Sequence, residues 1–319
     1  MVTPAPQADV LIIGAGIAGC AAAYHAARRG RRVVVIDAGI DCASTVPTAL
    51  INPVRGYLAR HSPDDVAGAR ASFALIDVLR AAGHPVVSGR GLWRPVPDVE
   101  QRDIWAAQLP GHIAHSWTEG HTLEAVLRGP WVATLYLPDS GWVETASLLH
   151  ALRSESQAEF VTGEVVGVDA QRRSVLLGAG VRVAARELLW CGGAFGAARI
   201  AGDARFRPGS VLECEERLHP DAVSYGLYSA PHGAGSVVGP STEAQYANYP
   251  PAWDAEGPEA RLVERARKVF RQALTVRSIW RGVRLESATL PEGLTDLGRF
   301  GSRGYLLAPR AAALWAERL

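Results

Sequence analysis

The sequence predicts an α/β protein with a doubly wound, mainly parallel sheet and an inserted α+β region. Three observations support this fold class. A strand, a glycine-rich turn and an Ala-rich helix follow one another near the N-terminus. The run 187–191 is almost entirely apolar, as a strand covered on both faces should be. Further glycine-rich turns follow at 192–196 and 298–304, so we expect distant segments to build one site.

The first forty residues predict a β-α-β unit. The apolar run 9–13 predicts a strand, 17–29 a helix that ends at Gly30, and 32–36 a second strand. Asp37 follows the second strand directly. A parallel strand pair joined by a helix is the expected result.

A G-x-G-x-x-G pattern, formed by Gly14, Gly16 and Gly19, joins the first strand to the helix. In this pattern the glycines permit a tight turn, approach of the backbone to a pyrophosphate, and close helix packing, respectively. Free N–H groups and the helix dipole favour phosphate there. Asp37 comes 23 residues after Gly14, near the spacing of an acid that binds a ribose hydroxyl. Together they predict a Rossmann-like dinucleotide site, although the pattern does not specify the dinucleotide.

Composition points to an ordinary globular protein of one or two domains. Of 319 residues, 48% are hydrophobic and 20% charged. The net charge of +1 gives no global attraction to nucleic acid or membrane. No apolar run approaches the roughly 20 residues that span a bilayer, and the first eight residues carry no secretory pattern. We therefore expect a cytoplasmic protein without membrane association.

No metal site or disulfide is expected. The four cysteines (Cys20, Cys42, Cys191 and Cys214) are scattered and lack C-x-x-C spacing, which indicates reduced, packed thiols. His112, His115 and His121 cluster without an acidic partner at ligand spacing, so we interpret them as surface or hydrogen-bonded histidines.

The remaining elements follow from hydrophobic periodicity and turn signals. Apolar residues of 63–82 share one helical face, and Thr145 is the expected N-cap of a helix over 145–154. Strands are expected in 159–168, 174–177, 181–191 and 208–253, and helices near 98–109, over 258–274 and at the C-terminus.

Three further segments resemble the D-amino-acid oxidase (DAO) family of FAD-dependent oxidoreductases, which includes glycine oxidase and sarcosine oxidase. Trp280-Arg-Gly-Val-Arg284 is similar to the family's W-x-G-[LV]-R-P element, with Leu285 in place of proline. The segment 298–309 resembles its closing G-H-[FY]-x-x-G-[IV]-L-L-A-P element. The segment 50–56 resembles a stretch beside the flavin in some bacterial members. The resemblance is weakest over 85–138 and 208–260.

The resemblance implies FAD as the dinucleotide. It places the N-terminal glycines at the pyrophosphate, Asp37 at the adenosine ribose, and backbone N–H groups of 301–305 at the flavin's pyrimidine edge. A helix N-terminus suits the negative charge that reduced flavin develops there. The residues assigned to the cofactor are Gly14, Gly16, Ile17, Ala18, Gly19, Asp37, Ala38, Ser44, Thr45, Asn52, Val165, Gly192, Gly193, Gly301, Ser302, Arg303, Gly304 and Tyr305.

The implied activity is oxidation of a small amine or amino acid to an imine by hydride transfer to flavin N5. Arg284 is the candidate substrate contact, because a guanidinium can hold a carboxylate with two parallel hydrogen bonds. Tyr225, Tyr228, Tyr246 and Tyr249 fall where relatives place substrate-facing tyrosines, and Tyr228 is the candidate beside the substrate.

Two absences qualify the resemblance. Sarcosine oxidase-like members use a lysine near the flavin, in the strand that reads 236–239 here, and this sequence has its only lysine at 268. The electron acceptor is therefore open. The stretch 277–287 holds no cysteine, so we expect FAD to be bound non-covalently.

Two other function classes stay open. Residues 261–284 carry eight basic residues and one acid. That bias admits a tRNA wobble-uridine-modifying oxidase of the same family, which acts on a carboxymethylaminomethyl group. The near-zero net charge and the lack of a fused methyltransferase domain make nucleic acid the less favoured partner. The third class is a non-catalytic flavoprotein subunit, and a homo-oligomer is also compatible with the sequence.

We expect the FAD-binding domain to be discontinuous, comprising residues 1–82, 141–209 and 283–319. The substrate domain would comprise 83–140 and 210–282. The three glycine-rich turns lie in separate segments of the first set, yet a single flavin needs all of them.

Overall fold

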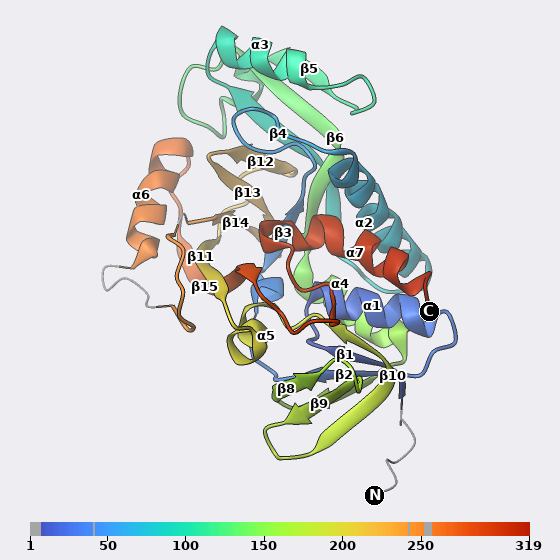
Figure 1. The fold of residues 1–319 in the computed structure, drawn as a ribbon. Helices are drawn as coiled ribbons and strands as arrows, with labels where there is room; N and C mark the ends of the chain where they lie inside the picture. The colour runs from blue at the N-terminus through green and yellow to red at the C-terminus, as the bar shows by residue number, and fades with distance from the viewer. Residues whose placement is uncertain (1–7, 41, 242, 252–256) are drawn as a thin grey trace, which may run out of the picture.

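The computed structural model describes residues 8–40, 42–241, 243–251 and 257–319. Two sheets divide the fold, with helices α1, α2 and α7 running between them (Figure 1). The first sheet has seven strands in the order β7-β2-β1-β10-β9-β8, with β16 paired to β10. The second has nine strands and forms the upper half of the view.

The parallel part of the first sheet contains the N-terminal β-α-β unit. Its strands are β1 (Ala8–Ile13), β2 (Val33–Asp37), β7 (Glu159–Thr162), β10 (Arg182–Trp190) and β16 (Thr295–Asp296). Side chains alternate across it, so that Val10 and Ile12 face one core while Leu11 and Ile13 face the other. Burial on both faces explains why these strands are uniformly apolar.

Different layers cover the two faces of this sheet. One core unites the sheet with the helices α1 (Ile17–Ala27), α2 (Pro63–Ala81), α4 (Thr145–Ser156) and α7 (Gly304–Ala316). The other face carries helix α5 (Gly193–Ile200) and the antiparallel strands β8 (Val165–Asp169) and β9 (Ser174–Leu177). The predicted α/β class with a Rossmann-like parallel sheet is confirmed.

The second sheet is mainly antiparallel and forms a curled half-barrel. Its strands run in the order β15-β11-β14-β13-β12-β4-β6-β3, with β5 paired to β6. They span β3 (Thr48–Ile51), β4 (Ser88–Val96), β5 (Ser116–Glu119), β6 (Ala133–Glu144), β11 (Ala204–Cys214), β12 (Ala222–Tyr225), β13 (Leu227–His232), β14 (Gly235–Gly239) and β15 (Val276–Ala288). Helices α3 (Val99–Gln108) and α6 (Pro258–Val269) flank it.

Helix α7 reaches the site because α2 holds its first turn. At Gly68 of α2, an added methyl group would overlap the carbonyl oxygen of Leu306. Pro309 lies inside α7 and has no N–H for the carbonyl of Tyr305, four residues earlier. The Ser72 hydroxyl of α2 donates to that carbonyl at 2.9 Å. The two helices therefore approach closely where α7 begins.

Some local predictions were wrong. Thr145 does not cap α4: Glu144 is the N-cap residue, and the Thr145 hydroxyl donates to the carbonyl of Val46 at 2.5 Å. The charged helix α6 ends at Val269 and not near 274, and α7 begins at Gly304 instead of after Pro309.

The expected boundaries at 140/141, 209/210 and 282/283 each fall inside a strand of the nine-stranded sheet, namely β6, β11 and β15. The domain division therefore stays a prediction. The expectation for residues 1–7 lies outside the described residues. Across the described part of the chain, no helix combines the length and apolarity needed to cross a bilayer.

Candidate functional site

A continuous groove runs from the end of the parallel sheet to the concave side of the antiparallel sheet. It comprises an outer cavity near β8 and α5, a middle cavity at the glycine-rich turns, and an inner cavity of about 300 Å³ between α7 and β15. The outer and middle cavities share Gly14, Asp37 and Gly192. The middle and inner cavities share Ser44, Arg284 and Gly301, among others, so the three form one track.

The N-terminal glycines let the turn between β1 and α1 pack directly against neighbouring main chain. Gly14 has a φ of +95°, and a methyl group there would lie 2.5 Å from the carbonyl oxygen of Cys191. At Gly19 an added methyl group would overlap the carbonyl oxygen of Gly14. At Gly16 it would meet only the hydroxyl of Ser44, at 2.8 Å. Gly14 and Gly19 are thus fixed by backbone packing, whereas Gly16 keeps the middle cavity open.

Two helix N-termini meet at the middle cavity. Neither α1 nor α7 has a side-chain cap or an acidic residue in its first turn. Ser44 joins them, because its hydroxyl accepts from the Ile17 N–H at 3.1 Å and its carbonyl accepts from the Tyr305 hydroxyl at 2.5 Å. The uncapped termini leave backbone donors and positive dipole ends for an anion.

The outer cavity lies beside Asp37. The Asp37 carboxylate accepts from the N–H groups of Ala15 at 2.7 Å and Gly39 at 2.8 Å, which fixes its position at the end of β2. Val165 lines the same cavity, and the buried indole Nε1 of Trp190 has no hydrogen-bond partner among the described residues. This end offers an acid and a flat apolar slot.

Strand β15 presents three residues of the W-x-G-x-R element to the inner cavity. Trp280, Gly282 and Arg284 alternate along the strand, so they share one face. A methyl group at Gly282 would overlap the Trp280 ring, so glycine makes room for the indole. Trp280 Nε1 donates to the Thr45 hydroxyl at 3.2 Å, which ties β15 to the loop after β2.

The Arg284 guanidinium has no hydrogen-bond or ion-pair partner in the part of the chain that the structure describes. Burial lowers its pKa, and the negative charge of Glu286 acts in the opposite direction. Glu286 itself pairs with Arg207 at 3.2 Å. A half-buried, unpaired guanidinium that faces a cavity is suited to hold an anion.

Tyr228 reaches the inner cavity from β13. Its hydroxyl donates to the carbonyl of Thr48 at 3.1 Å, and burial raises its pKa well above the ordinary value. Tyr228 is therefore neutral and oriented, with oxygen lone pairs that can accept from a ligand. Tyr225 packs against Trp131, and Tyr246 and Tyr249 lie near Phe206, so none of these three lines this cavity.

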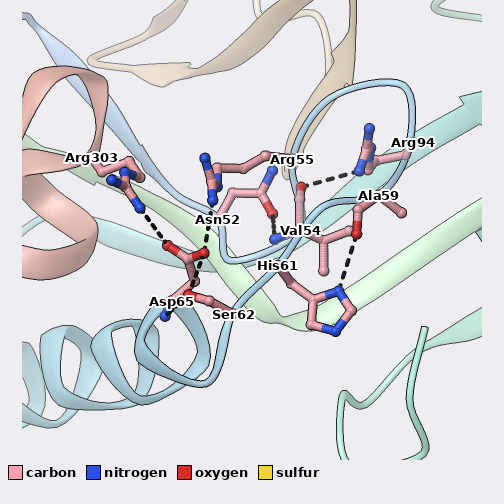
Figure 2. A network of polar contacts seen from close by, with 9 residues as sticks. All are labelled: Asn52, Val54, Arg55, Ala59, His61, Ser62, Asp65, Arg94 and Arg303. Carbon is pink, nitrogen blue, oxygen red and sulfur yellow. Dashed lines mark hydrogen bonds and ion pairs between the residues drawn. The ribbon is translucent and has the colours of Figure 1, made fainter. Parts of the chain in front are cut away.

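A buried carboxylate joins two more arginines that line the inner cavity. Figure 2 shows Asp65, at the start of α2, between Arg55 and Arg303. Arg55 Nη2 lies 2.8 Å from one carboxylate oxygen, and Arg303 Nη1 lies 3.3 Å from the other. Burial raises the pKa of Asp65, but hydrogen bonds from Ser62 and Arg55 outweigh it and the pKa is lowered. Asp65 is ionised at neutral pH.

The structure brings nearly all of the sequence-predicted site residues to this groove. Arg284, Tyr228 and every assigned cofactor residue except Gly19 and Thr45 line it. Gly19 and Thr45 lie just behind the lining and support it. Several lining residues were not predicted as site residues, among them Cys42, Trp190, Phe195, Ser210, Arg55 and Trp280.

The family model described as "FAD dependent oxidoreductase" (DAO) matches residues 9–318. The chain belongs to this DAO family of FAD-dependent oxidoreductases.

Solved structures confirm the fold. Glycine oxidase from Bacillus cereus superposes with a TM-score of 0.80 at 20% identity, over 98% of this chain and 94% of that one. Glycine oxidase from Geobacillus kaustophilus gives 0.77 at 21%, over 98% and 95%. Iminodiacetate oxidase from Chelativorans gives 0.78 at 21%, over 96% and 94%. At these identities the likeness establishes the fold alone.

Curated relatives match a smaller part of the chain. The tRNA 5-methylaminomethyl-2-thiouridine biosynthesis bifunctional protein MnmC of a Polaromonas species is 32% identical over 168 residues. The match covers 49% of this chain and 26% of that protein. The protein of the same name from Polaromonas naphthalenivorans is 32% identical over 165 residues, covering 47% and 25%. The matched segment therefore spans about a quarter of these relatives.

The groove fits the FAD that the family implies. Gly14 and Gly16, where a side chain would intrude, line the middle cavity, and the N-termini of α1 and α7 meet there without an N-cap side chain. An acid and an unpartnered indole stand at one end of the groove. The donor set of the middle cavity is backbone N–H, which suits phosphate.

Proposed function

We propose that this protein oxidises a small carboxylate-bearing amine or amino acid to its imine with non-covalently bound FAD. The observation that carries the proposal is the unpaired Arg284 guanidinium at the junction of the inner and middle cavities. Arg284 lines both cavities together with Gly301 and Gly304 at the start of α7, so an anion bound there would lie inside the groove. The names of the structural neighbours, glycine oxidase and iminodiacetate oxidase, favour small amino-acid substrates.

FAD, when bound, supplies the hydride acceptor. Arg284 would clamp the substrate carboxylate and thereby fix which C–H bond faces the flavin. Tyr228 would accept a hydrogen bond from the substrate and close one wall of the cavity. Among the residues that the structure describes, no Asp, Glu, His or Lys lines the inner cavity. The described lining thus supplies no carboxylate, imidazole or ammonium side chain as a general base, so on this proposal the amine arrives neutral.

Anaerobic reduction of the bound flavin tests the reaction without assuming oxygen as the acceptor. Purified holoprotein is mixed with glycine, with other D- and L-amino acids and with N-methylated amines, and the flavin absorbance is followed. We expect bleaching by at least one carboxylate-bearing amine, with the imine or its hydrolysis product recovered. If none bleaches the flavin, the proposal fails and a non-catalytic flavoprotein becomes the better description.

A second candidate, oxidation of a modified uridine in tRNA, is favoured by the two curated relatives. The basic stretch 261–284 gives it less support than the sequence suggested. Lys268 lies 2.6 Å from Glu264, and Arg281 lies 2.6 Å from Glu259, so acids neutralise part of it. A mobility shift with total tRNA, followed by nucleoside analysis after incubation, separates the two candidates.

A further inference from the structure

The Arg55–Asp65–Arg303 cluster carries a net positive charge. Asp65 is fully buried and supplies one negative charge to two guanidinium groups. About 40% of each arginine side chain remains exposed, and both arginines line the inner cavity. With Arg284, the cavity therefore carries three positive charges against one buried negative charge.

Arg55 lies on the loop between β3 and α2, and Arg303 directly precedes α7, so only Arg303 connects Asp65 to α7. Arg310 also links the two helices, by pairing with Asp64 at 2.8 Å on the solvent side. Ser72 and Gly68 hold the helices in close contact further along. A single arginine would neutralise Asp65, so the second guanidinium leaves a net positive charge at the cavity.

The free polar groups at this cluster are donors. Arg55 Nε is buried and has no hydrogen-bond partner among the described residues. The Asn52 side-chain oxygen accepts from the Val54 N–H at 3.0 Å, which leaves the amide nitrogen of Asn52 for the cavity. Ser302 adds a hydroxyl to the same lining. Guanidinium and amide N–H groups without acceptors form a site for oxyanions.

The loop that carries Arg55 is rigid. Arg94, buried under it, donates to the carbonyls of Val54 at 3.1 Å and Gly56 at 2.7 Å. The Arg94 guanidinium stacks 4.1 Å from the centre of the Trp105 ring. Trp105 in turn donates to the carbonyl of Tyr57 at 2.5 Å. Figure 2 shows the Arg94 hydrogen bond to Val54, next to Arg55 in the loop. These contacts position Arg55 before any ligand arrives.

We infer that the inner cavity has a second oxyanion subsite, formed by Arg55, Arg303 and Asn52. Its ligand is an oxyanion, either a carboxylate or a phosphate group, at the far end of the substrate from the group on Arg284. The preferred substrate is thus an amine with two anionic groups. This inference deepens the proposed function, and it rests on that function only where the ligand is called a substrate. The subsite itself is tested by binding alone.

Inert acids probe the subsite in the FAD-loaded protein. The probes are butyrate, glutarate and 3-phosphonopropionate, with affinity measured from the perturbation of the flavin spectrum and from the thermal shift. Because a charge-assisted contact is gained, we expect the two-anion probes to bind about tenfold or more tighter than butyrate. The ratio of glutarate to phosphonopropionate affinity tells a carboxylate subsite from a phosphate subsite.

Single substitutions locate the effect. Arg55→Gln and Arg303→Gln each leave Asp65 one arginine partner, so both variants should fold. Arg55→Gln should remove most of the preference for two anions and leave butyrate affinity unchanged. Arg303→Gln, at a residue also assigned to the cofactor, should remove the preference in protein that still binds FAD. Arg310→Gln is the matched control, because it also removes an arginine that pairs with an aspartate of α2 but lies outside the cavity. It should retain the preference in full.

Equal affinity for butyrate and glutarate would overturn the inference, as would a preference that survives both cavity variants or disappears in Arg310→Gln. These outcomes are separable from failure of the proposed function. If no amine reduces the flavin but glutarate still binds preferentially, the reaction is wrong and the subsite stands. If amines with one carboxylate reduce the flavin as well as those with two, the reaction stands and the subsite is wrong.

Discussion

The two halves of the groove achieve recognition with different parts of the chain. The outer and middle cavities use backbone: glycines, helix N-termini and one fixed acid make their surface. The inner cavity uses side chains, with arginines, tyrosines and a tryptophan from four separated segments. Backbone recognition needs glycines at fixed spacing, so it leaves a pattern in the sequence. Side-chain recognition leaves residues whose meaning depends on the fold.

The halves also differ in what a substitution should change. In the backbone half, a side chain placed at Gly14 or Gly19 displaces main chain, so fold and cofactor are lost together, whereas at Gly16 it meets a side chain. In the side-chain half, a guanidinium can be removed while the fold and the flavin remain. The predictions below separate these outcomes, beginning with the largest.

Gly19→Val should give little or no folded, yellow protein, because its side chain would overlap the Gly14 carbonyl. Gly16→Ala is the matched variant, since its methyl group meets only the flexible Ser44 hydroxyl. It should fold normally and lose FAD affinity. Soluble yield, flavin content and thermal unfolding check the pair. A folded, yellow Gly19→Val protein, or a Gly16→Ala protein with the wild-type flavin content, would contradict the division of labour.

Arg284→Ala should lower kcat/KM for a carboxylate-bearing amine by roughly 30- to 1000-fold, as expected for loss of about 2–4 kcal/mol. Arg284→Lys should recover only part of the lost kcat/KM, because an ammonium cannot form two parallel hydrogen bonds to a carboxylate. Flavin content should stay at the wild-type level in both. Normal turnover in both variants, or a wild-type preference for amines without a carboxylate, would show that Arg284 does not bind the substrate carboxylate.

The pH dependence should come from the substrate and not from the cavity. Burial raises the pKa values of Tyr228 and Tyr305, so both tyrosines stay neutral between pH 6 and 9. Burial lowers the pKa of Arg284, but a guanidinium starts so far above this range that it stays charged. We expect kcat/KM to rise with pH as the substrate amine loses its proton. The Kd of an inert carboxylate should stay constant over that range, and a Kd that follows the rate profile would indicate a titrating group in the site.

Ser72→Ala should destabilise the protein by about 1 kcal/mol, because the Tyr305 carbonyl loses its donor. Pro309→Ala restores an N–H four residues after that carbonyl. In the Pro309→Ala background, Ser72→Ala should therefore cost much less. Denaturant unfolding of the four proteins measures the coupling. Additive effects would show that Ser72 does not substitute for the missing N–H.

Sequence predicted the backbone half of the groove well for a physical reason. The G-x-G-x-x-G turn, its flanking strands and Asp37 are local in sequence, and their spacing alone constrains the geometry. Cofactor residues from Ser44 to Tyr305 came from resemblance to family motifs, and the structure brings them to the same groove. What they bind is still a prediction.

The side-chain half could be predicted only in part. Arg284 was found because Trp280-Arg-Gly-Val-Arg284 resembles a family motif, and the structure shows that its alternate residues line the inner cavity. Arg55 was missed because its place depends on Arg94 and α3, which are far from it in sequence. The N-cap signal at Thr145 failed because its hydroxyl finds the Val46 carbonyl, a tertiary contact that local propensity does not contain. Long-range pairing overrides local signals in each case.

A crystal structure of the protein with FAD and glutarate tests the central claim most directly. The account predicts the pyrophosphate over Gly14–Gly19, the flavin ring in the inner cavity at the start of α7, one carboxylate on Arg284 and the other at Arg55 and Arg303. A flavin bound elsewhere, or a glutarate that leaves Arg284 without contact, would contradict it.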